Sequence, residues 1–218
     1  MKTYTGSFGG GFALTGGNTD TKNFNLTFDM VRDPKTKNVI KANASYLRGT
    51  QSDILSVDRT SFNVRDEYSL TTRVYTFGQL DYLRDQFKQI IFLWAPSGGL
   101  GYKLINTDPT KLTVDGGAGG FFEKNPGKDV TRSGSVVAGE RFTHKLSASS
   151  TFNQNLGTIW KTDDFGDYLT NFSVGLTSSL MQNLDIKVEF IDSYKRKPQN
   201  IGVKRNDTAF ITAFVLKF

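Results

Sequence analysis

Hydrophobic and polar residues alternate along most of this 218-residue chain. Near its start Tyr4, Phe8 and Phe12 share one parity, and the residues of the other parity are small or polar. The alternation recurs around Phe24–Met30, Phe172–Leu176, Leu184–Phe190 and Phe210–Phe218. Successive side chains of a β-strand point to opposite faces, whereas no segment keeps a helical period of 3.6 over ten residues. The pattern therefore predicts an all-β chain.

Turn-forming residues divide the chain into twelve predicted strands with no linker between them, so we expect a single domain over residues 1–218. The predicted strands lie near residues 3–15, 22–32, 38–49, 58–69, 72–84, 90–105, 111–123, 133–144, 147–160, 167–180, 184–195 and 207–218. Tight connections such as Asn106–Thr110 and Gln182–Asn183 alternate with longer, more charged ones such as Lys124–Arg132. This alternation places short turns at one end and loops at the other.

The polarity of the two faces decides between a soluble sandwich and a membrane barrel. One parity is dominated by Phe, Tyr, Leu and Val, and the other mixes Gly, Ser, Asn and Thr with charged residues. An outward apolar band, a polar interior and an even strand number are typical of a transmembrane barrel. We therefore predict a twelve-stranded antiparallel transmembrane β-barrel, in which Phe172, Val174, Ile186, Val188 and Phe214 face lipid.

Composition excludes several other classes of protein. The absence of cysteine excludes disulfides and thiolate chemistry, and the single histidine argues against a zinc site, so we expect no metal or cofactor. The net charge of +6 is scattered, which argues against nucleic-acid binding. No apolar stretch is long enough for a transmembrane helix. Met1 leads directly into the first strand, and we expect a mature form with an added start methionine.

The last strand carries a recognisable pattern. Phe210, Phe214, Leu216 and Phe218 share one parity, and Phe218 is the final residue. This resembles the C-terminal signature of bacterial outer-membrane proteins, which the barrel assembly machinery reads. The alternative is an ordinary terminal strand that ends in phenylalanine. The signature implies a bacterial outer-membrane location among outer-membrane lipids, and an even strand number places both termini in the periplasm.

Three further segments carry a family resemblance. They are Gly16–Thr21 (GGNTDT), Tyr82–Phe87 (YLRDQF) and Gly98–Leu104 (GGLGYKL). Together with the strand spacing they resemble the salt-induced outer-membrane proteins of Gram-negative bacteria, a family built on a domain of unknown function. The resemblance implies an outer-membrane barrel and identifies no catalytic residue.

Charged residues of the polar parity are the candidates for the barrel interior. The lumen-lining candidates are Lys41, Arg65, Glu67, Asp81, Asp115, Glu123, Asp185, Lys187 and Glu189. We expect opposite charges on neighbouring strands to bridge the lumen. Five further cations are expected in or beside the last long loop, where salt screens them: Lys195, Arg196, Lys197, Lys204 and Arg205.

Such an interior suits a structural barrel or a narrow, weakly selective passage for ions and small solutes. One alternative is an accessory barrel that holds a partner protein, whose identity the sequence does not give. Another is a lipid-acting enzyme, which lacks a credible nucleophile and base. We therefore expect no enzymatic activity.

Other polar motifs have a structural and a functional interpretation. Gly16–Asn18 is read as a turn, although Asn18, Thr19 and Asp20 could bind a cation. Asp163, Asp164 and Asp167 could hold Ca²⁺ but are more typical of a solvated loop. Arg84–Asp85 is interpreted as pairing with a neighbouring strand, and His144 as a girdle or turn residue. Predicted girdle aromatics are Tyr4, Tyr46, Tyr68, Tyr75, Tyr102, Phe142, Trp160 and Tyr168, while Trp94 fits either face.

The C-terminal signature generates a first prediction. Deleting Phe218, or replacing it by Ser, should slow insertion in cells, because the assembly machinery reads the terminal aromatic residue. The refolded barrel should lose at most about 1.5–3 kcal/mol, the value of one buried apolar side chain. Pulse-chase assembly assays and unfolding in lipid measure the two effects. Insertion of the variant at the wild-type rate would contradict the signature.

Overall fold

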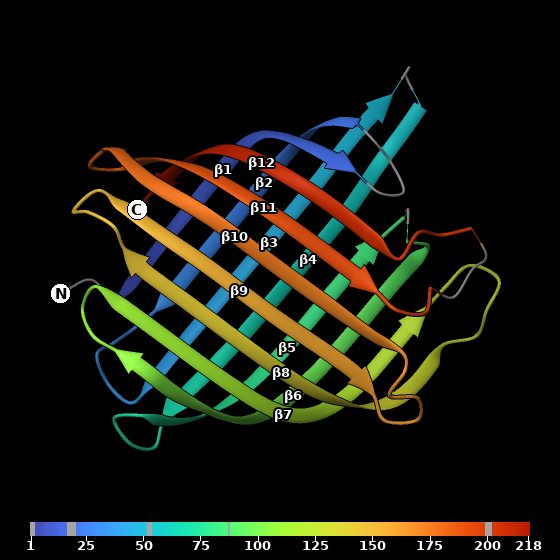
Figure 1. The fold of residues 1–218 in the computed structure, drawn as a ribbon, viewed down its shortest axis with the longest axis horizontal. Helices are drawn as coiled ribbons and strands as arrows, with labels where there is room; N and C mark the ends of the chain where they lie inside the picture. Colours follow the sequence, from blue (N-terminus) through green and yellow to red (C-terminus); the bar gives the residue numbers. More distant parts are fainter. Residues whose placement is uncertain (1–2, 17–20, 52–53, 87, 199–201) are drawn as a thin grey trace.

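The computed structural model describes residues 3–16, 21–51, 54–86, 88–198 and 202–218. These residues form a closed barrel of twelve antiparallel strands, as predicted (Figure 1). The strands are β1 (Tyr4–Gly16), β2 (Thr21–Arg32), β3 (Asn38–Gln51), β4 (Ile54–Ser69), β5 (Val74–Asp85), β6 (Ile90–Asn106), β7 (Thr110–Lys124), β8 (Thr131–Lys145), β9 (Ser150–Lys161), β10 (Tyr168–Met181), β11 (Leu184–Lys195) and β12 (Asn206–Lys217). Within these residues no helix is long and apolar enough to cross a membrane.

The two ends of the barrel differ in their connections. Both termini lie at the end with short turns, on the left in Figure 1, which we call the turn end. There the backbone N–H of Gly6 donates to Phe218 and the N–H of Asp33 donates to Thr3. The opposite end, the loop end, carries the long connections, but it also carries the short β5–β6 connection after Asp85. β4 begins at Ile54, four residues before its predicted start, because β3 and β4 extend as a hairpin beyond the neighbouring strands.

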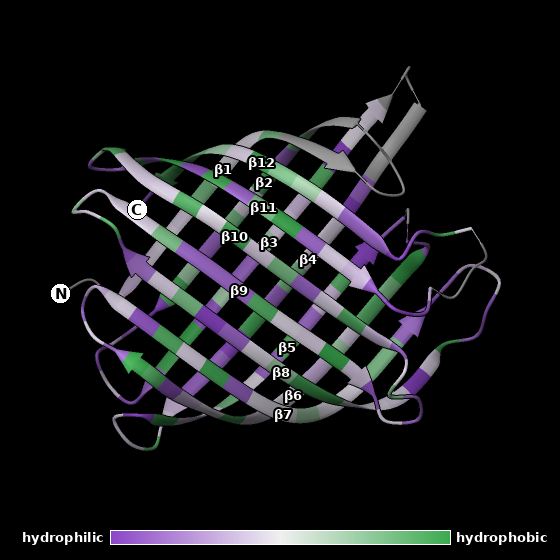
Figure 2. Cartoon of the chain, viewed as in Figure 1, coloured by the Kyte–Doolittle hydropathy of each residue, from purple (hydrophilic) through white to green (hydrophobic). Residues whose placement is uncertain are grey.

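The outer face of the barrel is apolar. Phe8, Phe12 and Phe214 are 48%, 79% and 57% exposed, an unusual degree for phenylalanine. Figure 2 shows hydrophobic and hydrophilic residues alternating along the strands. Trp94 is also on this face, 4.5 Å from Tyr82 between ring centroids. An apolar bilayer is the environment that such a face fits.

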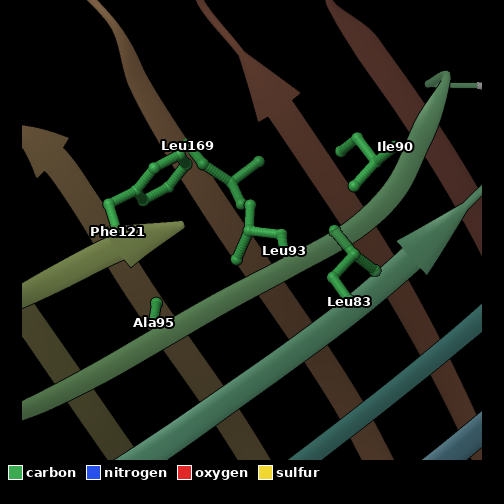
Figure 3. Close-up of a cluster of buried hydrophobic side chains, with 6 residues drawn as sticks. All are labelled: Leu83, Ile90, Leu93, Ala95, Phe121 and Leu169. Carbon is green, nitrogen blue, oxygen red and sulfur yellow. The ribbon is translucent and has the colours of Figure 1, made fainter. Parts of the chain in front are cut away.

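The interior departs from the expected wholly polar lumen. Leu83, Ile90, Leu93, Ala95, Phe121 and Leu169 form a buried apolar cluster inside the barrel (Figure 3). Its members come from β5, β6, β7 and β10, near the loop end. On the other side of the barrel Ile211 and Ala213 of β12 form a second cluster. The expectation was wrong here because side chains from opposite walls meet inside the barrel and exclude water from one another.

Two pairs of neighbouring strands approach too closely for inward side chains. A Cβ at Gly99 of β6 would lie 2.1 Å from the carbonyl oxygen of Gly116 on β7. A Cβ at Gly11 of β1 would lie 2.0 Å from the carbonyl oxygen of Thr212 on β12. The β6–β7 and β12–β1 pairs are on opposite sides of the ring of strands. Glycine at these positions therefore permits the close approach of the neighbouring backbones.

The orientation of β10 generates a second prediction. Val174 has the parity of exposed Leu176, whereas Ser173 faces inward and accepts a hydrogen bond from Asn155. Val174→Arg should therefore cost about 2–4 kcal/mol near the middle of the bilayer, and Ser173→Arg much less. Reversible unfolding in lipid vesicles measures both variants. Equal losses would contradict the assignment of the outer face to lipid.

Candidate functional site

Inward side chains in the half of the barrel nearer the turn end form an ion network. Arg65 of β4 and Arg141 of β8 both bind Asp115 Oδ2 of β7, at 2.9 and 2.6 Å. Glu67 accepts from Arg65 Nε at 2.8 Å and from Lys41 Nζ of β3 at 2.7 Å. We call these five residues the arginine network. Because β4 and β8 are not neighbours, the network crosses the lumen.

Tyr75 points into the barrel and contacts the arginine network, so it does not lie in the predicted aromatic girdle. It is 1% exposed, its hydroxyl donates to Asp115 at 3.1 Å, and it accepts from Arg141 at 3.0 Å. Its strand partner is Gly101, where a Cβ would lie 2.0 Å from the tyrosine Cζ. The glycine therefore leaves the space that the inward ring fills. The assignment of Tyr75 to the girdle was wrong because its parity, and not its nearness to a strand end, sets its direction.

A second buried cluster of charges lies near the loop end. Glu123 of β7 is fully buried and binds Lys195 of β11, and its other oxygen lies 3.6 Å from Lys161 Nζ of β9. Lys161 also binds Asp167 at 2.6 Å, and its ammonium lies 4.8 Å from the centroid of the Phe121 ring. We call the four charged residues the lysine–glutamate cluster. Lys195, the last residue of β11, is thus inside the barrel at 3% exposure, and the expectation that salt screens its charge was wrong.

The β5–β6 connection reaches across the mouth of the barrel. Lys88 is 4% exposed, and its Nζ donates to the Ser193 carbonyl at 2.8 Å and to the Ser193 hydroxyl at 3.1 Å. The same ammonium lies 3.5 Å from Asp207 of β12. Burial, reinforced by the charge of Arg59, lowers the pKa of Lys88 to about 8. This connection therefore narrows the loop end from one wall to the other.

Some inward positions remain open to solvent. Asp29 and Asn43 on β2 and β3, and Asn155 and Asn171 on β9 and β10, have inward parity but are exposed. Beside them Lys187 binds Glu189 at 2.8 Å. We call the four exposed residues the polar wall. It differs from the β5–β8 side, where inward side chains such as Leu93 are buried.

All nine predicted lumen residues lie on strands at inward positions, and the structure brings them into separate groups. Lys41, Arg65, Glu67 and Asp115 meet in the arginine network, and Glu123 lies in the lysine–glutamate cluster. Asp81 accepts from Asn63 at 2.7 Å, and Asp185 binds Lys217 at 2.6 Å. Lys187 and Glu189 pair with each other. Whether these residues line a passage stays a prediction.

Sequence reasoning missed several members of these groups. Arg141 and Lys161 could have been found, because each shares the parity of its strand's inward residues, such as Val137 and Ile159. Lys88 carries no such signal, since it lies in a turn and its partners are 105 residues away in the sequence. Only the closed barrel brings that turn against β11.

The remaining sequence candidates find local partners. His144 faces outward beside Phe142, and its Nδ1 is 2.8 Å from the Thr110 hydroxyl. Arg84 lies 3.1 Å from Asp58 on the neighbouring β4, as the structural interpretation expected.

The three loop carboxylates bind separate groups. Asp163 accepts from Ser133, Asp164 binds Lys197, and Asp167 binds Lys161. In the described ranges no group of three His, Asp or Glu side chains is placed to hold a metal ion. Asn18, Thr19 and Asp20 lie outside the described residues.

The sequence also matches a known family. The family model described as "Protein of unknown function, DUF481" matches residues 9–218. The chain belongs to this family. No curated protein matches the chain in sequence.

Solved structures share the fold at low sequence identity. The NanC porin has a TM-score of 0.64 at 9% identity, over 97% of this chain and 100% of that chain. The KdgM porin in complex with disordered oligogalacturonate has a TM-score of 0.54 at 10% identity, over 97% and 99%. The translocator domain of the autotransporter NalP from Neisseria meningitidis has a TM-score of 0.57 at 12% identity, over 100% and 89%. These similarities establish the barrel fold of this DUF481 protein.

The buried lysine of the β5–β6 connection generates a third prediction. The folded state releases the Lys88 proton at a lower pH than the unfolded state, whose lysine titrates near 10.5. The free energy of unfolding should therefore rise between pH 8 and 10.5, by up to about 3 kcal/mol. Lys88→Met should lack this rise, as urea unfolding at several pH values would show. Lys35→Met, at an exposed turn lysine, controls for general alkaline effects. An identical pH profile for wild type and Lys88→Met would contradict the assignment.

Proposed function

We propose that this DUF481 protein is a bacterial outer-membrane barrel that provides a narrow, weakly selective passage for ions and small polar solutes. The apolar outer face and the closed backbone ladder support a membrane location. The C-terminal pattern supports the outer membrane and periplasmic termini, and the resemblance to salt-induced proteins stays a prediction.

The solvent exposure of the polar wall is the observation that best supports a passage. Asn43 and Asn155 belong to opposite walls of the barrel, point inward and remain exposed to solvent. An asparagine amide both donates and accepts hydrogen bonds, so it can replace part of the hydration of a small polar solute. Water and solute would pass between these residues, because the lumen beside β5–β8 is occupied by packed side chains.

Charge pairing explains why selectivity should be weak. Each cation of the arginine network contacts a carboxylate, and Lys187 contacts Glu189. Paired charges cancel at short range and leave no continuous field of one sign along the lumen. The KdgM porin is described in complex with disordered oligogalacturonate, whereas the paired charges of this barrel do not favour an anionic solute.

A structural or accessory barrel is the second candidate. The apolar cluster and the lysine–glutamate cluster fill part of the lumen near the loop end. That packing would stabilise a barrel whose role is to hold a partner protein. The two candidates differ in whether solutes cross the membrane.

Conductance separates the two candidates and is the fourth prediction. The purified protein in planar bilayers should give a small conductance with weak ion selectivity. Lys187→Gln leaves Glu189 unpaired beside the polar wall, so the cation-to-anion permeability ratio should rise by roughly twofold or more. Lys197→Gln, which removes an exposed loop charge paired with Asp164, should change it little because salt screens that site.

Two outcomes would reject the passage. One is a folded barrel without measurable conductance, and the other is a selectivity that follows the loop charges alone. Either result would favour the accessory barrel.

A further inference from the structure

A carboxylate lies in the middle of the apolar outer face. Glu140 of β8 lies two residues after Ala138, which is exposed, and directly before Arg141, whose side chain is in the lumen. Its strand partners are Val114 of β7 and Leu156 of β9, so it shares their outward parity. Leu156 is midway along β9 between Phe152 and Trp160, aromatic residues near the two ends of that strand. Glu140 is therefore at the depth of the hydrocarbon core.

This depth sets Glu140 apart from charges near the rims. Arg84 and Arg132 also face outward, but each lies within two residues of a strand end, where water and headgroups are in reach. A charge at the middle of the bilayer is costly on a barrel's lipid face, and the cost falls to near zero at the interfaces. A polar group kept at this depth calls for a partner that lipid tails cannot supply.

The partial pairing of Glu140 indicates what that partner must offer. Gln154 Nε2 of β9 donates to Glu140 Oε2 at 3.1 Å. Within the part of the chain that the structure describes, this is the one hydrogen bond made by the Glu140 side chain. A carboxylate can accept about four hydrogen bonds, and Gln154 retains a second N–H and its carbonyl oxygen. The pair thus presents unused acceptors and an unused donor side by side.

We propose that this pair is the centre of a contact between two copies of the chain in the membrane. Two copies inserted in the same direction are related by a twofold axis along the membrane normal, so contacting groups must lie at equal depth. The 3.1 Å hydrogen bond places the head groups of Glu140 and Gln154 at one depth. Gln154 of each copy then donates its second N–H to Glu140 of the other. The contact is self-complementary, which a lipid or a purely apolar partner is not.

The residues around the Glu140–Gln154 pair allow the outer faces of the two barrels to approach each other. Ala138, two residues before Glu140, is exposed on the outer face together with its strand partner Gly116. Ala118 of β7 and Gly98 of β6 continue this exposed strip of small residues away from Glu140. Small residues let membrane-embedded backbones come close, which strengthens hydrogen bonds between them. This inference uses the outer surface alone and is independent of whether the lumen conducts.

Single-cysteine crosslinking tests the contact, because the chain contains no cysteine of its own. Ala138→Cys places a thiol beside the pair, and Ala44→Cys places one on the outer face of β3, across the barrel. In lipid vesicles at low protein-to-lipid ratio, a short bis-maleimide should crosslink the Ala138→Cys protein into dimers at least about fivefold more than the Ala44→Cys protein. Equal crosslinking of the two would overturn the proposal.

Substitution of the carboxylate in the Ala138→Cys background separates a contact from a tolerated surface charge. Glu140→Leu should reduce the dimer yield by about tenfold, since both reciprocal hydrogen bonds are lost. Glu140→Gln should retain most of the dimer, because an amide oxygen can still accept from Gln154. Unheated gel migration verifies that each variant is a folded barrel, and Leu at a lipid-facing site should not impair folding. A folded Glu140→Leu protein that dimerises like wild type would refute the proposed interface.

Discussion

Closure of the backbone hydrogen-bond ladder is the constraint on which the rest of this structure depends. In an apolar bilayer every unpaired N–H and C=O is costly, and a closed ring of strands is the β-structure that leaves none at an edge. Here β1 pairs with β12 from Ser7↔Lys217 to Gly16↔Thr208. Once the ring is closed, the alternation of side chains fixes one set of residues outward and the other inward. The apolar outer face and the crowded lumen are both consequences of that closure.

The lumen of a twelve-stranded ring is so wide that only long side chains reach from one wall to another. Arg65 of β4 reaches Asp115 of β7 three strands away, and Lys195 reaches Glu123 four strands away. Burying such charges is costly unless each finds a partner, and removing one partner leaves an uncompensated charge. The cations of both clusters therefore appear together with carboxylates. The same pairing limits the electrostatic selectivity that the barrel can have.

Filling of the lumen is uneven. Phe121 and Leu93 pack together beside β6 and β7, whereas Asn43 of β3 and Asn155 of β9 remain in contact with solvent. Gly99 and Gly11 allow the close approach of neighbouring backbones at two opposite places in the ring, where a side chain would not fit. On the outer face the exception is of the opposite kind, because polar side chains occupy positions on an apolar surface. There Glu140 and Gln154 place a carboxylate and an amide among apolar side chains at the middle of the bilayer.

The sequence by itself determined the strand number, the antiparallel ring and the face of residues such as Val174 and Phe214, because a period of two is local information. It also indicated that Arg65, Asp115 and Glu123 point inward, since parity carries that too. It did not determine which inward residues meet. Lys88 and Ser193 are joined only by ring closure, and the inward ring of Tyr75 has room only because its strand partner Gly101 has no side chain. Contacts across the lumen depend on where distant strands are brought by curvature and register, and no local pattern encodes that distance.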